Sequence, residues 1–147
     1  MTLKILLNQG RLIPHSTSKD EVISLLELIK RDIKDSKVEA ISEDRRLATA
    51  YNAALQTATV LLYCVGYKTK GVGHHSTVFQ AMKEIMGKEY IDLADYFDSC
   101  RNKRNIIDYT HAWGVSETEV EELIEETEKF VKLVTKWIKT NYSKYIL

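Results

Sequence analysis

The fold is decided by residues 42–66, which read SEDRRLATAYNAALQTATVLLYCVG. Ser42 is of a type that caps the start of helices, and Gly66 is of a type that ends them. Between them, apolar side chains recur at helical spacing at Leu47, Ala50, Tyr51, Ala54, Ala58, Leu61, Leu62 and Val65. Several of these are alanines, so a neighbouring helix can pack closely. We therefore predict a long helix at the centre of a helical bundle.

The same periodicity predicts helices on both sides of this segment. They cover about residues 18–36 and 75–86, and two more begin near residue 90 and at residue 116. Ser18 with Glu21, and Ser116 with Glu119, have the spacing of capping boxes, in which two orphan backbone donors are satisfied reciprocally. Both boxes favour sharp helix starts at these positions.

The segments between the helices are predicted to be extended or irregular. A short amphipathic start ends near Gly10. Pro14 predicts an extended stretch over residues 12–15, because proline biases its predecessor away from the helical region. Residues 66–73 read GYKTKGVG, and we expect a basic loop punctuated by glycines.

The fold class that follows is all-α. The chain has 147 residues and 44% hydrophobic content, enough for one core, so we expect a single domain over residues 1–147. It has one proline and six glycines, too few for the many turns of a β-sandwich. Short connections favour antiparallel neighbours. We predict an up-and-down four-helix bundle with a short additional helix.

Composition also narrows the function and the location. The 21 basic and 21 acidic residues balance, so no overall field draws the chain to nucleic acid, and an anionic ligand needs a local patch. Cys64 and Cys100 lie in apolar helical patterns, which predicts buried reduced thiols. No apolar run approaches the roughly 20 residues of a membrane span, and the start lacks the features of a signal peptide. We expect a cytoplasmic protein without a membrane partner.

Residues 100–111, CRNKRNIIDYTH, form the candidate working surface. An apolar stripe that includes Phe97 and Cys100 runs straight into Arg104. Arginine grips a phosphate through its planar fork, and histidine exchanges protons near neutral pH. Arg104 and His111 therefore have the chemistry for metal-free RNA cleavage, in which the 2′-hydroxyl attacks its own phosphate.

A structural interpretation of these residues is also open. Arg104 and His111 are seven positions apart, so they share a helix face, but their backbones are separated by roughly 10 Å. A symmetric dimer would bring two copies of the pair around one cleft. Alternatively, Arg104 pairs with Asp108 at i, i+4, and His111 marks a helix C-terminus, where a cation is favoured.

Other candidates for chemistry are weaker. The sequence contains no Walker loop, G-x-G-x-x-G, H-E-x-x-H or nucleophile elbow, which excludes many enzyme classes. His74 and His75 are adjacent, so on a helix they diverge by about 100° and cannot chelate one metal. A capping or surface role is favoured for both.

Four segments together are typical of one protein family. They are residues 10–15, 50–56, 66–75 and 101–109, which read GRLIPH, AYNAALQ, GYKTKGVGHH and RNKRNIIDY. Through them the sequence resembles the HEPN family, the higher-eukaryote and prokaryote nucleotide-binding domains, over nearly the whole chain. The resemblance implies an up-and-down four-helix bundle that forms a homodimer.

The resemblance also implies an activity. Many HEPN proteins are metal-independent ribonucleases with an arginine, four to six residues of which the first is commonly polar, and a histidine. Arg104, Asn105 and His111 match this motif with six residues between arginine and histidine. The resemblance implies that Arg104 stabilises the phosphate, that Asn105 orients the substrate or Arg104, and that His111 is the acid-base group. No metal or other cofactor is expected.

Partners and an alternative function follow from the same resemblance. Arg101 and Lys103 would guide RNA, and Asp108 and Tyr109 would contribute to the substrate site. Family members are often encoded beside a small nucleotidyltransferase as toxin and antitoxin, with Tyr109 an accessible target for modification, although ordinary bundle packing is the other interpretation of this tyrosine. The alternative is a non-catalytic HEPN module that binds a nucleotide or a partner protein at its dimer cleft.

Overall fold

The computed structural model describes residues 2–71, 73–109 and 114–146, with the backbone alone over residues 105–109. These residues contain six α-helices, a two-stranded sheet and two single turns of 3-10 helix. In chain order the elements are α1 (Leu3–Asn8), β1 (Leu12–Pro14), α2 (Lys19–Ser36), α3 (Glu43–Val65), β2 (Tyr67–Thr69), α4 (His74–Met86), η1 (Lys88–Tyr90), α5 (Ile91–Tyr109), α6 (Glu117–Asn141) and η2 (Ser143–Tyr145).

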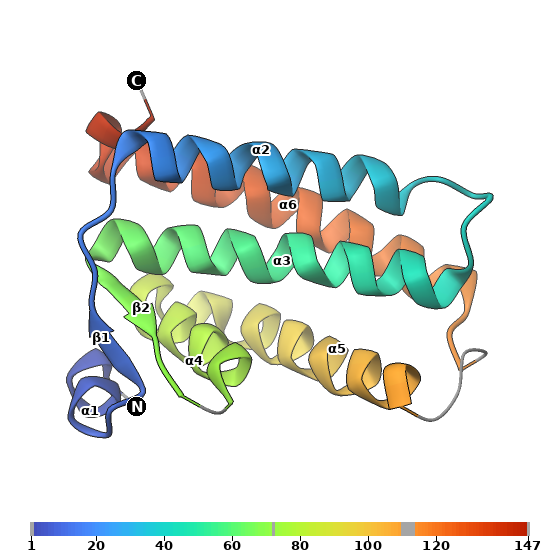
Figure 1. Cartoon of the computed structure of the whole chain (residues 1–147), viewed down its shortest axis with the longest axis horizontal. Coiled ribbons are helices and arrows are strands. Elements are labelled where there is room, and N and C mark those ends of the chain that lie inside the picture. The colour runs from blue at the N-terminus through green and yellow to red at the C-terminus, as the bar shows by residue number, and fades with distance from the viewer. Residues whose placement is uncertain (1, 72, 110–113, 147) are drawn as a thin grey trace.

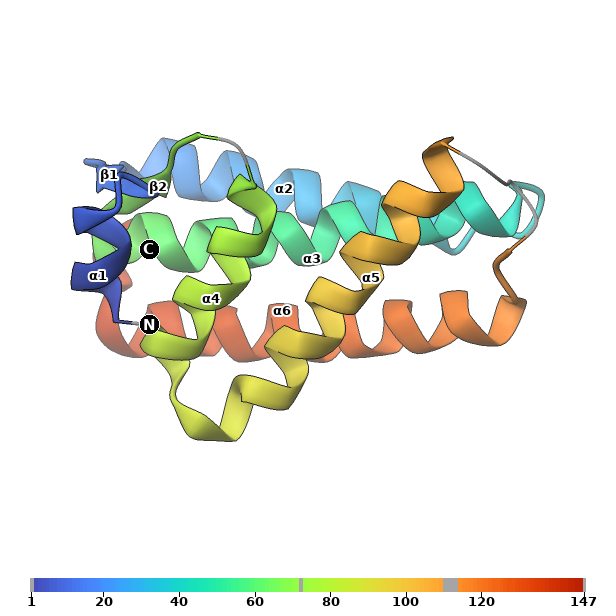
Figure 2. The ribbon, with the colours of Figure 1, turned by 90° about the horizontal axis from the view of Figure 1, so that it is seen from below.

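Four of the helices form an up-and-down bundle. Helices α2, α3 and α6 lie along the long axis, with α2 antiparallel to the other two (Figure 1). Figure 2 shows that α5 crosses α3 obliquely and meets α4 in a V on the face of α3 away from α2. The predicted all-α class is confirmed, and α4 is the additional helix of the bundle.

Helix α3 is central because its side chains are apolar on more than one side. It begins after Ser42 as predicted, although the Ser42 side chain makes no capping hydrogen bond. All of the predicted inner stripe is buried except Val65, which is half-buried. The helix also buries Ala53, Thr57, Val60 and Cys64 outside that stripe. A helix buried on several sides packs against neighbours all round, as α3 does.

A row of buried aromatic rings crosses the core and ends at α3. Ring centroids are 5.2 Å apart between Phe130 of α6 and Phe97 of α5, and 5.9 Å apart between Phe97 and Phe79 of α4. The row continues from Phe79 to Tyr51 of α3 at 6.2 Å. These separations lie in the favourable range for aromatic pairs. The row fixes α4 and α5 against α3 and places a tyrosine hydroxyl at its end.

The small sheet differs from the prediction of a loop over residues 66–73. Strand β1 is the predicted extended stretch, and it pairs antiparallel with β2, with Leu12 opposite Thr69 and Pro14 opposite Tyr67. The glycine-rich composition suggested a loop, but backbone hydrogen bonds from the distant N-terminal segment stabilise a short strand there. The sheet thus secures the chain immediately before α4.

The two predicted capping boxes have different outcomes. At the start of α6, both hydrogen bonds between Ser116 and Glu119 are present. At the start of α2, the Ser18 side chain accepts from the Glu21 backbone amide at 3.2 Å. The Glu21 carboxylate, however, contacts His15 Nε2 at 2.5 Å. Burial is the largest single influence on the pKa of Glu21 and raises it, but the hydrogen bonds with His15 and Thr17 and the nearby positive charges leave this pKa below its usual value. The box at the start of α2 is therefore only half formed.

Two expectations from composition are also tested. Cys64 and Cys100 are both buried with free thiols, as predicted. Within the described part of the chain, none of the helices combines the length and the apolar character that crossing a bilayer requires.

Candidate functional site

The cations of α5 divide between two sides of the helix. Successive helical residues are offset by about 100°. Arg101 and Arg104 are three residues apart and lie on the side that faces α3 and α4. Lys103 lies on the side that faces α6, where it forms an ion pair with Glu119. The predicted cluster is therefore two separate surfaces in the folded chain.

Arg104 stands where the apolar side of α5 ends. Its Cζ atom lies 5.7 Å from the centroid of the Tyr51 ring, within the range of a cation–π contact. The Nε atom of Arg104 is buried, and Tyr51 is fully buried beneath it. Contact with a fixed aromatic face limits the positions that this guanidinium adopts.

Arg101 lies one turn earlier and lines a small pocket. Its Nε donates to the Asp98 carboxylate at 2.8 Å, which orients the guanidinium along α5. The pocket has a volume of about 190 Å³, and the start of α4 supplies its other lining residues, Gly73, His74, His75 and Ser76. Helices α4 and α5 therefore form an open pocket between a guanidinium and two imidazoles.

His75 links this pocket to the core. Its Nδ1 lies 3.3 Å from the hydroxyl of Tyr51, at the end of the row of aromatic rings. The His74 and His75 rings meet edge to face, with centroids 4.4 Å apart. His74 is exposed, whereas His75 is half-buried. His75 is thus positioned by contacts with α3 as well as by its own helix.

The electrostatics of the site keep His75 and Tyr51 neutral. Burial, reinforced by His74, Arg104 and Arg101, lowers the pKa of His75 to about 4. Burial raises the pKa of Tyr51 well above its usual value, against the opposing effect of the two arginines. At neutral pH the site therefore combines two guanidinium groups, a neutral imidazole and a protonated phenol.

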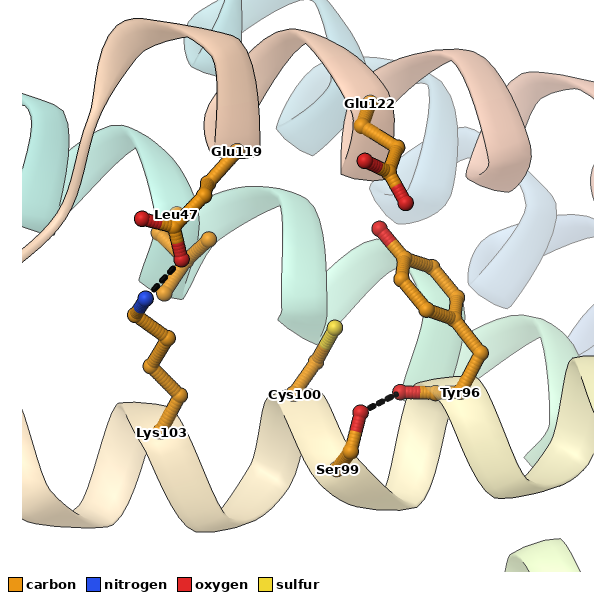
Figure 3. Close-up of a pocket in the computed structure, with 7 residues that line it drawn as sticks. All are labelled: Leu47, Tyr96, Ser99, Cys100, Lys103, Glu119 and Glu122. Atoms are coloured by element: carbon orange, nitrogen blue, oxygen red, sulfur yellow. Dashed lines mark hydrogen bonds and ion pairs between the residues drawn. The ribbon is translucent and has the colours of Figure 1, made fainter.

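Lys103 lies in a second pocket, between α5, α3 and α6 (Figure 3). Figure 3 shows its ammonium directed to Glu119, with the Cys100 thiol and the Tyr96 ring pointing into the same space. Burial raises the pKa values of both Cys100 and Tyr96. With Glu119 and Glu122 in its lining, this pocket is less suited to an anion than the pocket beside Arg101.

The remaining predicted site residues fall at the edge of the described structure. Asn105, Asp108 and Tyr109 belong to the last two turns of α5, and their side chains are outside the described part of the chain. His111 lies outside the described residues altogether. The roles predicted for these four residues remain predictions.

Two residues of the site were missed by sequence reasoning. His75 was expected to have a capping or surface role, and Tyr51 was expected only as a core residue. Their proximity to Arg101 and Arg104 arises from packing between helices far apart in sequence, which no local spacing reveals. The one available signal was the presence of both residues in segments that resemble the same family.

Comparisons with known proteins give one family. A family model described as SAV_6107-like HEPN matches residues 38–135, about two thirds of the chain. The match includes Tyr51, His74, His75, Arg101 and Arg104. Comparisons with curated proteins and with solved structures returned no match.

Proposed function

This chain belongs to the HEPN family, and we propose that it is a metal-independent endoribonuclease that acts as a homodimer. Arg104 binds the phosphate to be cleaved, Asn105 orients the substrate or Arg104, and His111 transfers protons. Arg101, Asp108 and Tyr109 contact the rest of the RNA. A symmetric interface would set two copies of these residues around one cleft. Lys103, which faces α6 on another side of the helix, guides RNA from outside this cleft.

The observation that carries this proposal is the placement of Arg104. A guanidinium at the end of the core-facing side of α5, held over the Tyr51 ring, is a rigid cation beside the surface. Arg101 adds a second cation on the same side, next to a polar pocket. A preorganised positive charge is what the transition state of phosphodiester cleavage requires, because negative charge grows on the phosphate oxygens.

The reaction needs no group beyond the protein and the RNA. A base removes the proton of the 2′-hydroxyl while the 2′-oxygen forms a bond to phosphorus. The bond from phosphorus to the 5′-oxygen breaks, and an acid protonates that oxygen. The products are a 2′,3′-cyclic phosphate and a 5′-hydroxyl. His111 of one or both protomers serves as base and acid.

The test is incubation of single-stranded RNA with the protein in the presence of a chelator. We expect cleavage that leaves cyclic phosphate ends, detected by gel electrophoresis and mass spectrometry. Arg104→Ala and His111→Ala should each lower the rate by roughly 10²–10⁴-fold, the range typical of groups that stabilise charge or transfer protons.

Arg45→Ala is the matched control, because Arg45 is an exposed arginine near the start of α3. It should cleave at the wild-type rate. Wild-type activity in either the Arg104 or the His111 variant would contradict the role given to that residue. Loss of all cleavage on adding chelator, with recovery on adding a metal, would contradict the mechanism.

A second function, binding without cleavage, is favoured by one observation. Arg101 and the pocket that it lines, with Arg104 one turn along the helix, place cationic and polar groups together without His111. A non-catalytic HEPN module of this kind would bind a nucleotide or a partner protein at its dimer cleft. A protein that is inert to RNA, but whose melting temperature rises with added nucleotide, would support this function over the first.

The physiological setting that we propose is a toxin and antitoxin pair. A small nucleotidyltransferase would be the antitoxin, and it would block the ribonuclease or modify it at Tyr109. A gene for such an enzyme beside the gene for this chain would support the pairing.

A further inference from the structure

Building on the proposed function, we propose that the pocket beside Arg101 binds a phosphate group of RNA or of a nucleotide, and that His75 donates a hydrogen bond to it. The site would be distinct from the Arg104 and His111 pair predicted from the sequence. It is assembled from the start of α4, from Arg101 of α5 and, through Tyr51, from α3.

The size of the pocket suits a phosphate group better than a whole nucleotide. Its volume is about 190 Å³, whereas pockets that enclose drug-sized ligands start at about 300 Å³. A phosphate fits within it, and the attached ribose and base would extend beyond it along the surface. The size of the pocket thus suits the phosphate group of a longer ligand.

The charges around the pocket favour an anion. Arg101 lines it, Arg104 lies one turn further along the same side of α5, and Asp98 is the carboxylate that accepts from Arg101. Asp98 engages Arg101 through Nε, and a guanidinium has five N–H donors in total. Donors of Arg101 other than Nε therefore stay available to a ligand in the pocket, and Ser76 adds a hydroxyl to the lining.

His75 is arranged as a donor rather than as a base. The Tyr51 hydroxyl is buried and has one proton, and His75 Nδ1, at 3.3 Å, is the acceptor beside it. Leaving that proton without an acceptor would cost free energy, so Tyr51 donates to Nδ1. The imidazole is neutral at physiological pH because its pKa is lowered to about 4. Its remaining proton is then on Nε2, which donates to a phosphate oxygen.

The experiment observes the histidine rings directly by NMR. The chain has four histidines, His15, His74, His75 and His111, and His→Gln variants assign their Cε1–Hε1 signals. The protein is titrated with inorganic phosphate, with uridine 3′-monophosphate and with a 2′-O-methyl oligoribonucleotide, which cannot be cleaved because it lacks the 2′-hydroxyl. We expect the His75 signal to move with all three probes and the His15 signal to stay in place.

His15 is a suitable internal control because its Nε2 is engaged by Glu21, away from the pocket. Tighter binding of the oligonucleotide than of the mononucleotide identifies the RNA backbone as the source of the phosphate. Equal affinity for the two identifies a mononucleotide. Either result supports a phosphate site.

Variants of Arg101 test the site independently of His75. Arg101→Gln should weaken binding of uridine 3′-monophosphate by about tenfold or more, since it removes a charge-assisted contact. Arg101→Lys keeps the charge beside Asp98 and should bind with intermediate affinity, which covers the case in which the Gln variant folds poorly. Arg45→Gln is the matched control and should bind like the wild type.

The site is refuted if the His75 signal stays in place while other signals report saturation, or if Arg101→Gln binds like the wild type. The same data separate this proposal from the endoribonuclease. Movement of His75 without RNA cleavage would retain the phosphate site and reject the enzyme. Cleavage with an unresponsive His75 would retain the enzyme and reject this site.

Discussion

Tyr51 illustrates how one residue connects the core to the candidate site. Its ring closes the row of buried aromatics and lies beneath Arg104, and its hydroxyl meets His75. The burial of Tyr51 could be predicted from its place in the apolar stripe of residues 42–66. Its contact with His75, 24 positions along the chain, could not, because that contact depends on how α4 packs against α3.

At this scale we predict that His75 makes stability depend on pH. Unfolded, its imidazole takes up a proton near pH 6.5, and folded it does so only near pH 4. The unfolded state therefore binds more protons between these values, and stability falls as the pH falls through this window. Among the residues whose side chains the structure describes, the titratable groups that face His75 are His74, Tyr51, Arg101 and Arg104.

The measurement is urea unfolding of the wild type and of His75→Gln at pH 7 and pH 5. The wild type should lose about 1 kcal/mol more than the variant, less than the shift alone gives over this pH interval because the ring is only half-buried. His74→Gln, which removes an exposed neighbouring ring, should keep most of the wild-type dependence. Parallel pH profiles for the wild type and His75→Gln would show that His75 does not contribute.

At the scale of a single helix, α5 shows what a sequence pattern can and cannot give. The entry of Arg104 into the apolar stripe was visible from helical spacing alone, because periodicity is a local property. The separation of Arg101 from Lys103 also follows from this spacing, because residues two apart on a helix are offset by about 200°. Which neighbour covers each side does not follow, because that depends on how α5 packs in the bundle. Lys103 faces Glu119 of α6, and the same carboxylate also caps α6.

Two serines that precede helices, Ser116 and Ser42, allow a test of how much helix capping contributes to stability. Ser116→Ala should lower the free energy of unfolding by about 1 kcal/mol, because it removes the hydrogen bond to the Glu119 amide and half of a capping box. Chemical denaturation of the purified variant measures this loss.

Ser42→Ala is the control, since Ser42 precedes a helix of similar length and its side chain makes no capping bond. Its effect should stay within about 0.5 kcal/mol. Equal losses in the two variants would show that the capping geometry does not decide their contributions.

For the whole molecule, the bundle was predictable and the small sheet was not. The helices follow from apolar periodicity, but β2 needs Leu12 and its neighbours, more than 50 positions earlier, to supply its hydrogen bonds. Arg11, beside β1, also donates to the Thr77 hydroxyl at 2.9 Å, so the N-terminal segment contacts α4 close to the candidate pocket. The family match begins at residue 38 and so leaves out α2, although α2 packs along α3 in the bundle.

Two truncations follow from this arrangement. Removal of residues 1–16 takes away Leu6 and Leu12, which cover Leu62 and Ala81, and should lower the free energy of unfolding by roughly 2–4 kcal/mol. Unfolding should remain cooperative, because the bundle is retained. Removal of residues 1–37 also takes away α2 with buried Val22 and Ile29, and should abolish cooperative unfolding.

Circular dichroism during heating distinguishes the two variants. A sharp transition in the shorter fragment, 38–147, would show that the family-matched region folds without α2. No sharp transition in the longer fragment, 17–147, would show that the sheet and α1 are essential to the bundle.

The burial of Tyr51 has a consequence for how this protein diverges over generations. Folding alone selects for a large aromatic at this position, so lineages that lose all activity would still keep it. Arg101 and His74 contribute little to the core, and drift would remove them once no ligand is bound. Among homologues, the retention of these partly exposed residues, rather than of the tyrosine, would distinguish proteins that still bind a ligand from those that have lost this function.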